Sequence, residues 1–128
     1  YQPNSSLMQC NAGERVLLRF ANLGYAHASM TLAGIKMRVV GEDATPRRGR
    51  DGTDTSYVTN SISMSAGQSF DAIFEAPAYT GPGPYDTYIL YNRNYRAANN
   101  LGGGYGGQMT EVRVFPAGTL GPQALPNT

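Results

Sequence analysis

The stretch GERVLLRFAN at residues 13–22 decides the fold class of this chain. Its side chains alternate between two faces, an apolar one and a mixed one: Val16, Leu18 and Phe20 against Leu17, Arg19 and Ala21. A period of two residues is the pattern of a β-strand with one buried face. We therefore expect a strand at residues 15–22, closed by the turn-forming Asn22-Leu23-Gly24.

Further strands are expected on both sides of this stretch. They lie at residues 6–11, 28–32, 35–40, 57–64, 86–91 and 109–115, and around the inward-facing Phe70, Ala72 and Phe74. Gly, Pro and Asn clusters separate these short segments, a spacing typical of a sandwich or barrel. The sequence thus predicts an all-β protein of about eight strands.

The connections between the strands differ in length. Residues 41–56 and 77–84 are rich in turn-forming residues and predict exposed loops, while Ala33-Gly34 predicts a bend. Residues 95–99 leave room for one helical turn. Three prolines follow residue 115, so we expect a domain at residues 1–116 and a Pro-rich tail or interdomain linker at 117–128.

Composition limits the class of protein. Of 128 residues, 41% are hydrophobic and 15% are charged, which suits one domain with its own core and is too apolar for a disordered chain. The formal net charge of +1 gives little attraction to nucleic acid or to an anionic membrane. No apolar run reaches the length of a transmembrane helix. We therefore expect no nucleic-acid partner and no membrane span.

Charged residues give two structural expectations. Arg47, Arg48 and Arg50 are followed at once by acidic residues, which predicts a solvated loop of mixed sign rather than a phosphate site. Arg19 and Asp71 stand within apolar strands, where a buried charge is tolerated mainly when it is paired. We expect these two side chains to lie near each other or to cap backbone groups.

Nucleophilic and metal-binding side chains are scarce. The chain has one cysteine, Cys10, and one histidine, His27, so an internal disulfide is excluded and a zinc site would need further ligands. His27 has no Gly-x-Ser-x-Gly serine to activate, and a turn histidine beside a strand is the simpler interpretation. Residues 102–107 fit the dinucleotide pattern G-x-G-x-x-G only because they are nearly all glycine, and a strand, not a helix, follows them.

Most of the nine tyrosines lie in the last third of the chain, at Tyr79, Tyr85, Tyr88, Tyr91, Tyr95 and Tyr105. Tyrosines are ordinary pair-forming residues of sheets, but exposed ones also form platforms for sugars and proteins. We expect about half of this group in the core or on the sheet surface. The rest are a candidate interaction face.

Three segments carry a resemblance to a known family. They are GERVLLRFAN at residues 13–22, SAGQSFD at residues 65–71 and QMTEVRV at residues 108–114. Together they resemble a cupredoxin-type domain of a multicopper oxidase, in particular the middle domain of the three-domain enzymes. The resemblance implies a cupredoxin-like Greek-key sandwich or barrel.

The same resemblance bears on copper, because this chain departs from the copper-carrying pattern. Thr31-Leu32-Ala33-Gly34 stands where copper-carrying domains have His-x-His-Gly, and residues 88–94 stand where they have His-Cys-His. Met109 follows a sequence similar to the family's Gly-Met corner, and His27 is close to a position where relatives often have a histidine. A type 1 site needs two imidazoles and a thiolate, and a trinuclear cluster needs more imidazoles than this chain has.

The resemblance therefore predicts a copper-free structural domain, with no catalytic, cofactor-binding or metal residues in this chain. Copper is expected in other cupredoxin domains of the same parent oxidase, which are the expected partners, and oligomers are compatible with the sequence. The implied location is periplasmic or secreted, and the chain alone should not be catalytic. Two alternatives stay open: a stand-alone β-sandwich binding module that uses exposed tyrosines, and a type 1 electron carrier.

Overall fold

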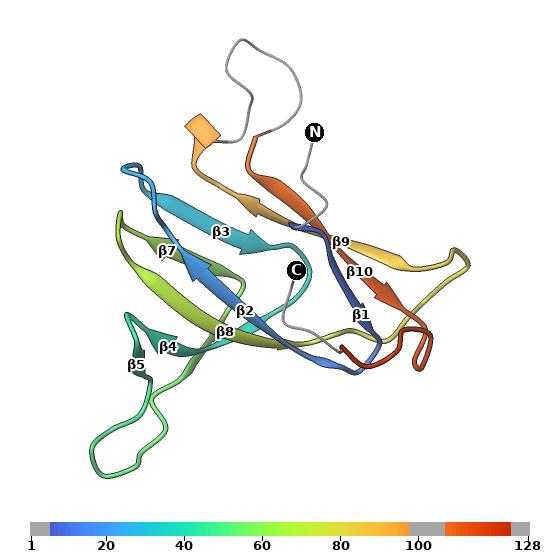
Figure 1. Cartoon of the computed structure of the whole chain (residues 1–128), viewed down its shortest axis with the longest axis horizontal. Helices are drawn as coiled ribbons and strands as arrows, with labels where there is room; N and C mark the ends of the chain where they lie inside the picture. Colours follow the sequence, from blue (N-terminus) through green and yellow to red (C-terminus); the bar gives the residue numbers. More distant parts are fainter. Residues whose placement is uncertain (1–5, 98–106, 124–128) are drawn as a thin grey trace.

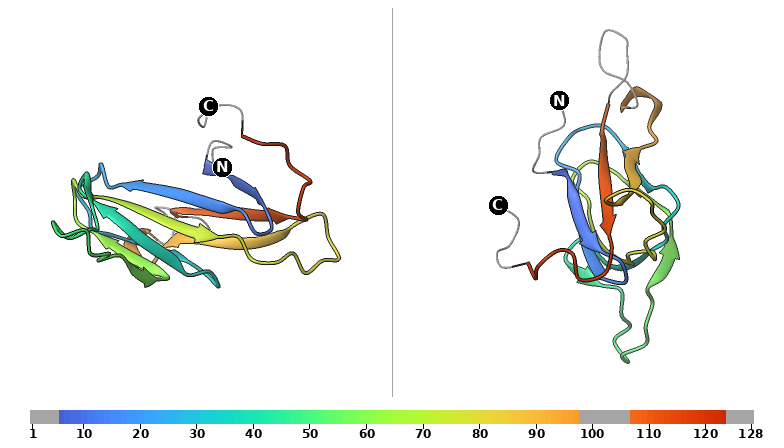
Figure 2. Two further views of the ribbon diagram at one scale, coloured as in Figure 1. Left: turned by 90° about the horizontal axis from the view of Figure 1, so that it is seen from below. Right: turned by 90° about the vertical axis from the view of Figure 1, so that its right-hand side faces the viewer.

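The computed structural model of the chain describes residues 6–97 and 107–123. Two sheets enclose one core (Figures 1 and 2). The first sheet contains, in spatial order, β1 (Met8–Asn11), β10 (Met109–Phe115), β9 (Asp86–Asn92), β3 (Ala28–Leu32) and β7 (Ser61–Met64). The second contains β2 (Arg15–Ala21), β8 (Ser69–Glu75), β4 (Met37–Glu42) and β5 (Thr45–Pro46), with β6 (Tyr57–Thr59) paired to β4.

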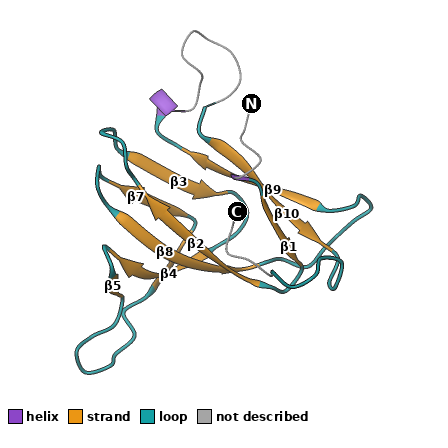
Figure 3. Ribbon diagram, in the orientation of Figure 1, coloured by secondary structure: helices purple, strands orange, loops and turns teal. Residues whose placement is uncertain are grey.

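Strands and loops make up nearly all of the described chain, and η2 (Tyr95–Ala97) is a single 3-10 turn (Figure 3). The predicted all-β architecture is confirmed. Most of the predicted strands agree with the observed ones to within two residues at each end.

β2 and β8 pair in antiparallel register and form the centre of the second sheet. The predicted inward residues of the two strands are register partners: Val16 with Phe74, Leu18 with Ala72, and Phe20 with Phe70. Four of these six are buried, and Val16 and Phe20 pack against the same core. Each square ångström of apolar surface removed from water here contributes about 25 cal/mol. The alternation in residues 13–22 therefore determines which face of the second sheet packs against the core.

The single strand expected at residues 57–64 is wrong, because this segment is two strands. β6 pairs with β4 in the second sheet, whereas β7 pairs with β3 in the first. The chain changes sheet at Asn60, where the Thr59 hydroxyl accepts a hydrogen bond from Ser61 N (3.1 Å) and donates one to Ser61 O (2.9 Å). Both halves keep β-strand character, so periodicity does not reveal the crossing.

β4 begins and ends two residues later than expected, because it forms a hairpin with β5. Asp43 and Ala44 make the turn with φ angles of 46° and 59°. Positive φ at both central residues is the requirement of a two-residue type I′ hairpin. Part of the loop expected at residues 41–56 is therefore strand, and its remainder projects from the sandwich as a second hairpin, bridged between Arg48 and Asp54.

Arg19 and Asp71 are direct partners in the β2–β8 register, with Arg19 Nε 3.6 Å from Asp71 Oδ1. The predicted proximity is confirmed. The assumption that these charges are buried is wrong, since 77% of the Arg19 side chain and 43% of the Asp71 side chain are exposed. They belong to the outer face of the sheet, where such a pair contributes at most about 1 kcal/mol.

The chain turns back onto β1 after β10. Thr119 N donates to Pro116 O, and the Asn11 side chain then holds both backbone groups of Leu120. Leu120 N donates to Asn11 Oδ1 (2.8 Å), and Asn11 Nδ2 donates to Leu120 O (3.0 Å). The domain boundary at residue 116 stays a prediction, while the described start of the tail is attached to the sandwich.

Candidate functional site

Three strand ends meet at one end of the first sheet (Figure 1). β9 ends at Asn92, which is registered with Met30 of β3, and β10 begins at Met109 opposite Tyr91. The resemblance stated above places copper ligands of related domains on these segments. This end of the sandwich is therefore the position at which to test for a metal site.

Asn92 occupies the centre of this end and is only 3% exposed. Its Oδ1 accepts hydrogen bonds from Ser29 N (2.8 Å) and Asn94 N (3.0 Å), and its Nδ2 donates to Gln108 Oε1 (2.8 Å). Its backbone N–H donates to Gln108 O (2.9 Å). A buried amide with this many partners links residues of β3, β9 and the start of β10. Sequence analysis missed Asn92, because an asparagine at a strand end usually indicates only a turn.

His27 lies directly before β3 and is exposed. Its carbonyl oxygen accepts a hydrogen bond from Asn94 Nδ2 (2.7 Å). This placement agrees with a turn histidine beside a strand. Met109, at the start of β10, is 43% exposed. The fold thus brings His27 and Met109 to the same end of the first sheet, with the Asn92 amide network between their strands.

The donor atoms here do not fit a type 1 copper ion, which takes two imidazoles and a thiolate. His27 is the one histidine of the sequence. Cys10 is registered with Val114 near the far end of β10, and burial and the nearby Glu14 charge raise the pKa of its thiol. Within residues 6–97 and 107–123, no three His, Cys, Asp or Glu side chains gather closely enough to hold a metal ion.

The tyrosine group is mostly built into the sheets. Tyr88 packs against the core. The centroid of the Tyr85 ring lies 5.2 Å from that of the Phe115 ring, and Arg113 Cζ lies over the same Tyr85 ring, 4.7 Å from its centroid. Tyr79 and Tyr91 are half-buried. Tyr95 is exposed, and Tyr105 lies outside the described residues. Of the five described members of the group, Tyr95 is thus the one in the exposed class.

The loop between β2 and β3 instead presents two large apolar side chains to solvent. Leu23 is 93% exposed and Tyr25 is 101% exposed. Asn22 fixes the loop, since its Nδ2 donates to Ala26 O (2.9 Å) and Met64 O (3.3 Å) and its Oδ1 accepts from Gly24 N (3.2 Å). These hydrogen bonds hold the backbone of the loop, so the two exposed apolar residues are carried on an ordered turn.

The arginine-rich segment is a loop of mixed sign, as predicted. Arg47 Nη1 contacts Glu42 Oε2 (3.1 Å), and its guanidinium lies 5.2 Å from the Tyr57 ring. Asp51 and Asp54 accept hydrogen bonds from Thr53 and Ser56 two residues further on. These bonds lower the pKa of both carboxyl groups, so both are ionised at neutral pH.

Among the described residues, none of the helical segments has the length and apolar composition that crossing a bilayer requires.

The two-sheet fold and its strand order define a cupredoxin-like sandwich domain, as predicted. A family profile described as multicopper oxidase matches residues 4–104. The chain belongs to the multicopper oxidase family. A comparison with curated proteins gives no match.

Solved structures show the same fold. The blue copper oxidase from Nitrosomonas europaea is 17% identical with a TM-score of 0.71, and the multicopper oxidase mgLAC is 24% identical with a TM-score of 0.71. For each, the match covers 88% of this chain and 32% of the other. The laccase from Botrytis aclada is 19% identical with a TM-score of 0.64, and the match covers 94% of this chain and 20% of the laccase. This chain thus spans about a third or less of these proteins.

Proposed function

We propose that this chain is a copper-free structural domain of a multicopper oxidase, and that the redox chemistry belongs to other cupredoxin domains of the parent protein. Such oxidases couple one-electron oxidation of a substrate to the reduction of dioxygen to water. The observation that carries the proposal is the Asn92 network, which fills the strand-end position with amides. Hydrogen bonds cross-link β3, β9 and β10 there, so a metal is not needed to hold the strand ends together.

The bare loop between β2 and β3 supports a role within a larger protein. Leu23 and Tyr25 are almost fully exposed on a loop that Asn22 holds in place. Exposed apolar side chains on an ordered loop suit contact with another domain. The similar structures are three to five times longer than the matched segment, which leaves room for such domains. We place the parent protein in the periplasm or outside the cell.

Copper titration of the pure chain tests the metal-free part of the proposal. We expect no intense blue colour, no stoichiometric copper after dialysis, and no oxygen consumption with a phenolic substrate. A His27→Ala variant is the matched control. Copper that the exposed imidazole binds adventitiously should be lost in this variant, and its loss should not change the colour of the protein solution. One tightly held copper per chain with a blue absorption band would refute the proposal.

The multidomain part is tested separately, by reading the coding sequence on both sides of residues 1 and 128. We expect a His-x-His-Gly segment upstream and a His-Cys-His segment downstream in the same frame. A signal-peptide sequence directly before residue 1 and a stop codon directly after residue 128 would contradict this part. That result would leave the copper titration unaffected.

A further inference from the structure

A hollow of about 390 Å³ lies beside β4 and β5, at the base of the projecting hairpin at residues 47–56. Its lining includes three arginines, one acidic residue and two apolar residues: Arg38, Arg47, Arg48, Asp54, Val40 and Pro46. The volume is within the range of small-molecule sites, which is roughly 300–1,000 Å³. Three of its lining residues are arginines, in a chain whose formal net charge is only +1.

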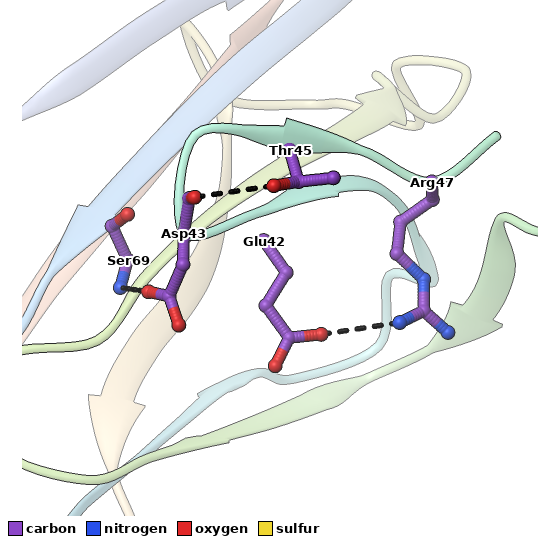
Figure 4. A network of polar contacts seen from close by, with 5 residues as sticks. All are labelled: Glu42, Asp43, Thr45, Arg47 and Ser69. Atoms are coloured by element: carbon purple, nitrogen blue, oxygen red, sulfur yellow. Dashed lines mark hydrogen bonds and ion pairs between the residues drawn. The ribbon is translucent and has the colours of Figure 1, made fainter.

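Polar contacts hold the β4–β5 hairpin next to the hollow (Figure 4), and of the residues in this network Arg47 also lines the hollow. Asp43 makes two hydrogen bonds to Ser69 at the start of β8. Its Oδ1 accepts from Ser69 N (2.8 Å), and its own N–H donates to Ser69 O (3.0 Å). On the same hairpin, the Thr45 hydroxyl donates to Asp43 O (3.4 Å), and Arg47 is fixed by Glu42. The site is therefore built on a braced hairpin, which lowers the cost of ordering it around a ligand.

The arginines retain hydrogen-bonding capacity. Arg38 makes one side-chain hydrogen bond, from Nη1 to Ser56 Oγ (3.0 Å), and Arg48 makes one, from Nε to Gly52 O (3.1 Å). A guanidinium has five N–H donors, so most donors of these two side chains have no protein acceptor within the described residues. Arg47 Nε is buried and has no hydrogen-bond partner among the described residues. Arg38 and Arg48 therefore have the donors that an acceptor in the hollow could use.

The charge of the site limits the ligand. The lining contains three arginines and one aspartate, Asp54, and Glu42 pairs with Arg47, so these five residues have a formal charge of +1. A ligand with one negative charge brings the formal charge of these residues to zero, whereas a dianion would make it negative. Carboxylate and guanidinium groups also match in shape, because both are planar and bind through two parallel hydrogen bonds. Val40 and Pro46 add an apolar surface that inorganic anions cannot use.

We infer that the hollow beside β4 and β5 binds a small organic monocarboxylate, with its carboxylate on Arg38 and Arg48 and its apolar body against Val40 and Pro46. This site lies on the second sheet, away from the strand ends of the Asn92 network. It does not depend on whether the parent protein is an oxidase.

The test is a titration of the ¹⁵N-labelled chain with sodium benzoate at constant ionic strength, followed by the arginine Nε–Hε resonances. We expect saturable shifts at Arg38, Arg47 and Arg48. Benzyl alcohol lacks the charge and inorganic phosphate lacks the apolar body, so both should bind more weakly. Phosphate binding as tight as benzoate, equal shifts with chloride, or no saturable shift would each overturn the proposal.

Variants assign the binding to these residues. Arg38→Gln should weaken benzoate binding by about tenfold, the usual effect of removing one charged hydrogen-bond donor. Arg50→Gln is the matched control, because Arg50 is on the same hairpin but does not line the hollow. It should leave the affinity unchanged.

Asp54→Asn keeps the oxygen that accepts from Ser56 N and removes the repelling charge. It should therefore bind benzoate roughly threefold more tightly. This gain does not depend on Arg38→Gln remaining folded. Equal losses in Arg38→Gln and Arg50→Gln, or weaker binding by Asp54→Asn, would refute the assignment.

Discussion

Two buried asparagines hold the opposite ends of β10 in different ways. Asn92 is 3% exposed and lies beside the first residues of the strand, while Asn11 is 5% exposed and is registered with Phe115, the last residue. The Asn92 network contains only neutral groups. The Asn11 network contains a carboxylate, because Glu14 accepts from both Asn11 N (2.8 Å) and Asn11 Nδ2 (2.8 Å).

The two networks therefore stabilise different parts of the chain. One holds the sandwich together, and the other attaches the segment that follows it. Asn92 ties together strands that already pair, so its loss affects the sandwich itself. Asn11 ties Leu120, after the last strand, to the start of the first sheet, so its loss affects where residues 116–123 lie. On the proposed function, the first amide replaces a metal as the cross-link, and the second fixes the direction in which the chain leaves the domain.

The largest effect is expected from Asn92→Ala. The substitution leaves Ser29 N and Asn94 N without their acceptor, and it creates a small cavity. We expect a loss of about 2–4 kcal/mol in the free energy of unfolding, measured by urea denaturation. Asn60→Ala is the control, since Asn60 is exposed and should cost at most about 0.5 kcal/mol. Equal losses in the two variants would mean that the amide network is not a stabilising centre.

Asn11→Ala should cost less, about 1–3 kcal/mol, but should act on a different segment. The Leu120 amide hydrogen loses its acceptor, so its hydrogen exchange should accelerate, and residues 116–123 should become sensitive to protease. In Asn92→Ala, at conditions where the chain stays folded, the Leu120 amide should remain protected. Rapid exchange of Leu120 in both variants would break the distinction between the two ends.

The strand pattern could be predicted from the sequence because it depends on local alternation. Val16, Leu18 and Phe20 identify the inward face of β2, and the same rule applied to Asp71 places it opposite Arg19. The change of sheet at Asn60 could not be predicted in this way. It depends on which partner strand each half of residues 57–64 pairs with, and both partners, β4 and β3, lie far from this segment in the sequence.

The candidate sites were less accessible from the sequence. The sequence does show that the chain lacks the ligands of a type 1 copper site, because its histidines and cysteines can be counted. The burial of Asn92 is not, since asparagine is usually exposed in loops and only tertiary packing makes it a network centre. The hollow on the second sheet cannot be predicted from the loop that contains Arg47 and Arg48, because its third arginine, Arg38, comes from β4.

Acid should weaken the Asn11 end and not the Asn92 end. The hydrogen bonds from Asn11 N, and then from its side chain, lower the pKa of Glu14. Ionised Glu14 therefore stabilises the folded state above the ordinary glutamate pKa, and this contribution is lost as the pH falls through the lowered value. Glu14 is exposed, so we expect an effect below about 1 kcal/mol.

The measurement is the stability difference between the native chain and Glu14→Gln, from about pH 7 down to about pH 3. The difference should shrink toward acid, and in the native chain only, the protection factor of the Leu120 amide, which is corrected for the intrinsic pH dependence of exchange, should fall with it. Using the difference removes the contributions of Asp51 and Asp54, whose pKa values are also lowered. A difference that grows toward acid would contradict the role given to Glu14.

The smallest expected effect is the coupling between the two ends. Gln108→Ala removes one acceptor from Asn92 without emptying the core, and Gln108 lies at the opposite end of β10 from Asn11. The double variant Asn11→Ala/Gln108→Ala should therefore equal the sum of the single variants to within about 0.5 kcal/mol. Asn11→Ala/Glu14→Gln is the contrasting pair, since these two residues touch, and its losses should not add. If the distant pair were also non-additive, β10 would transmit strain along its length, and the two asparagines would belong to one unit rather than two.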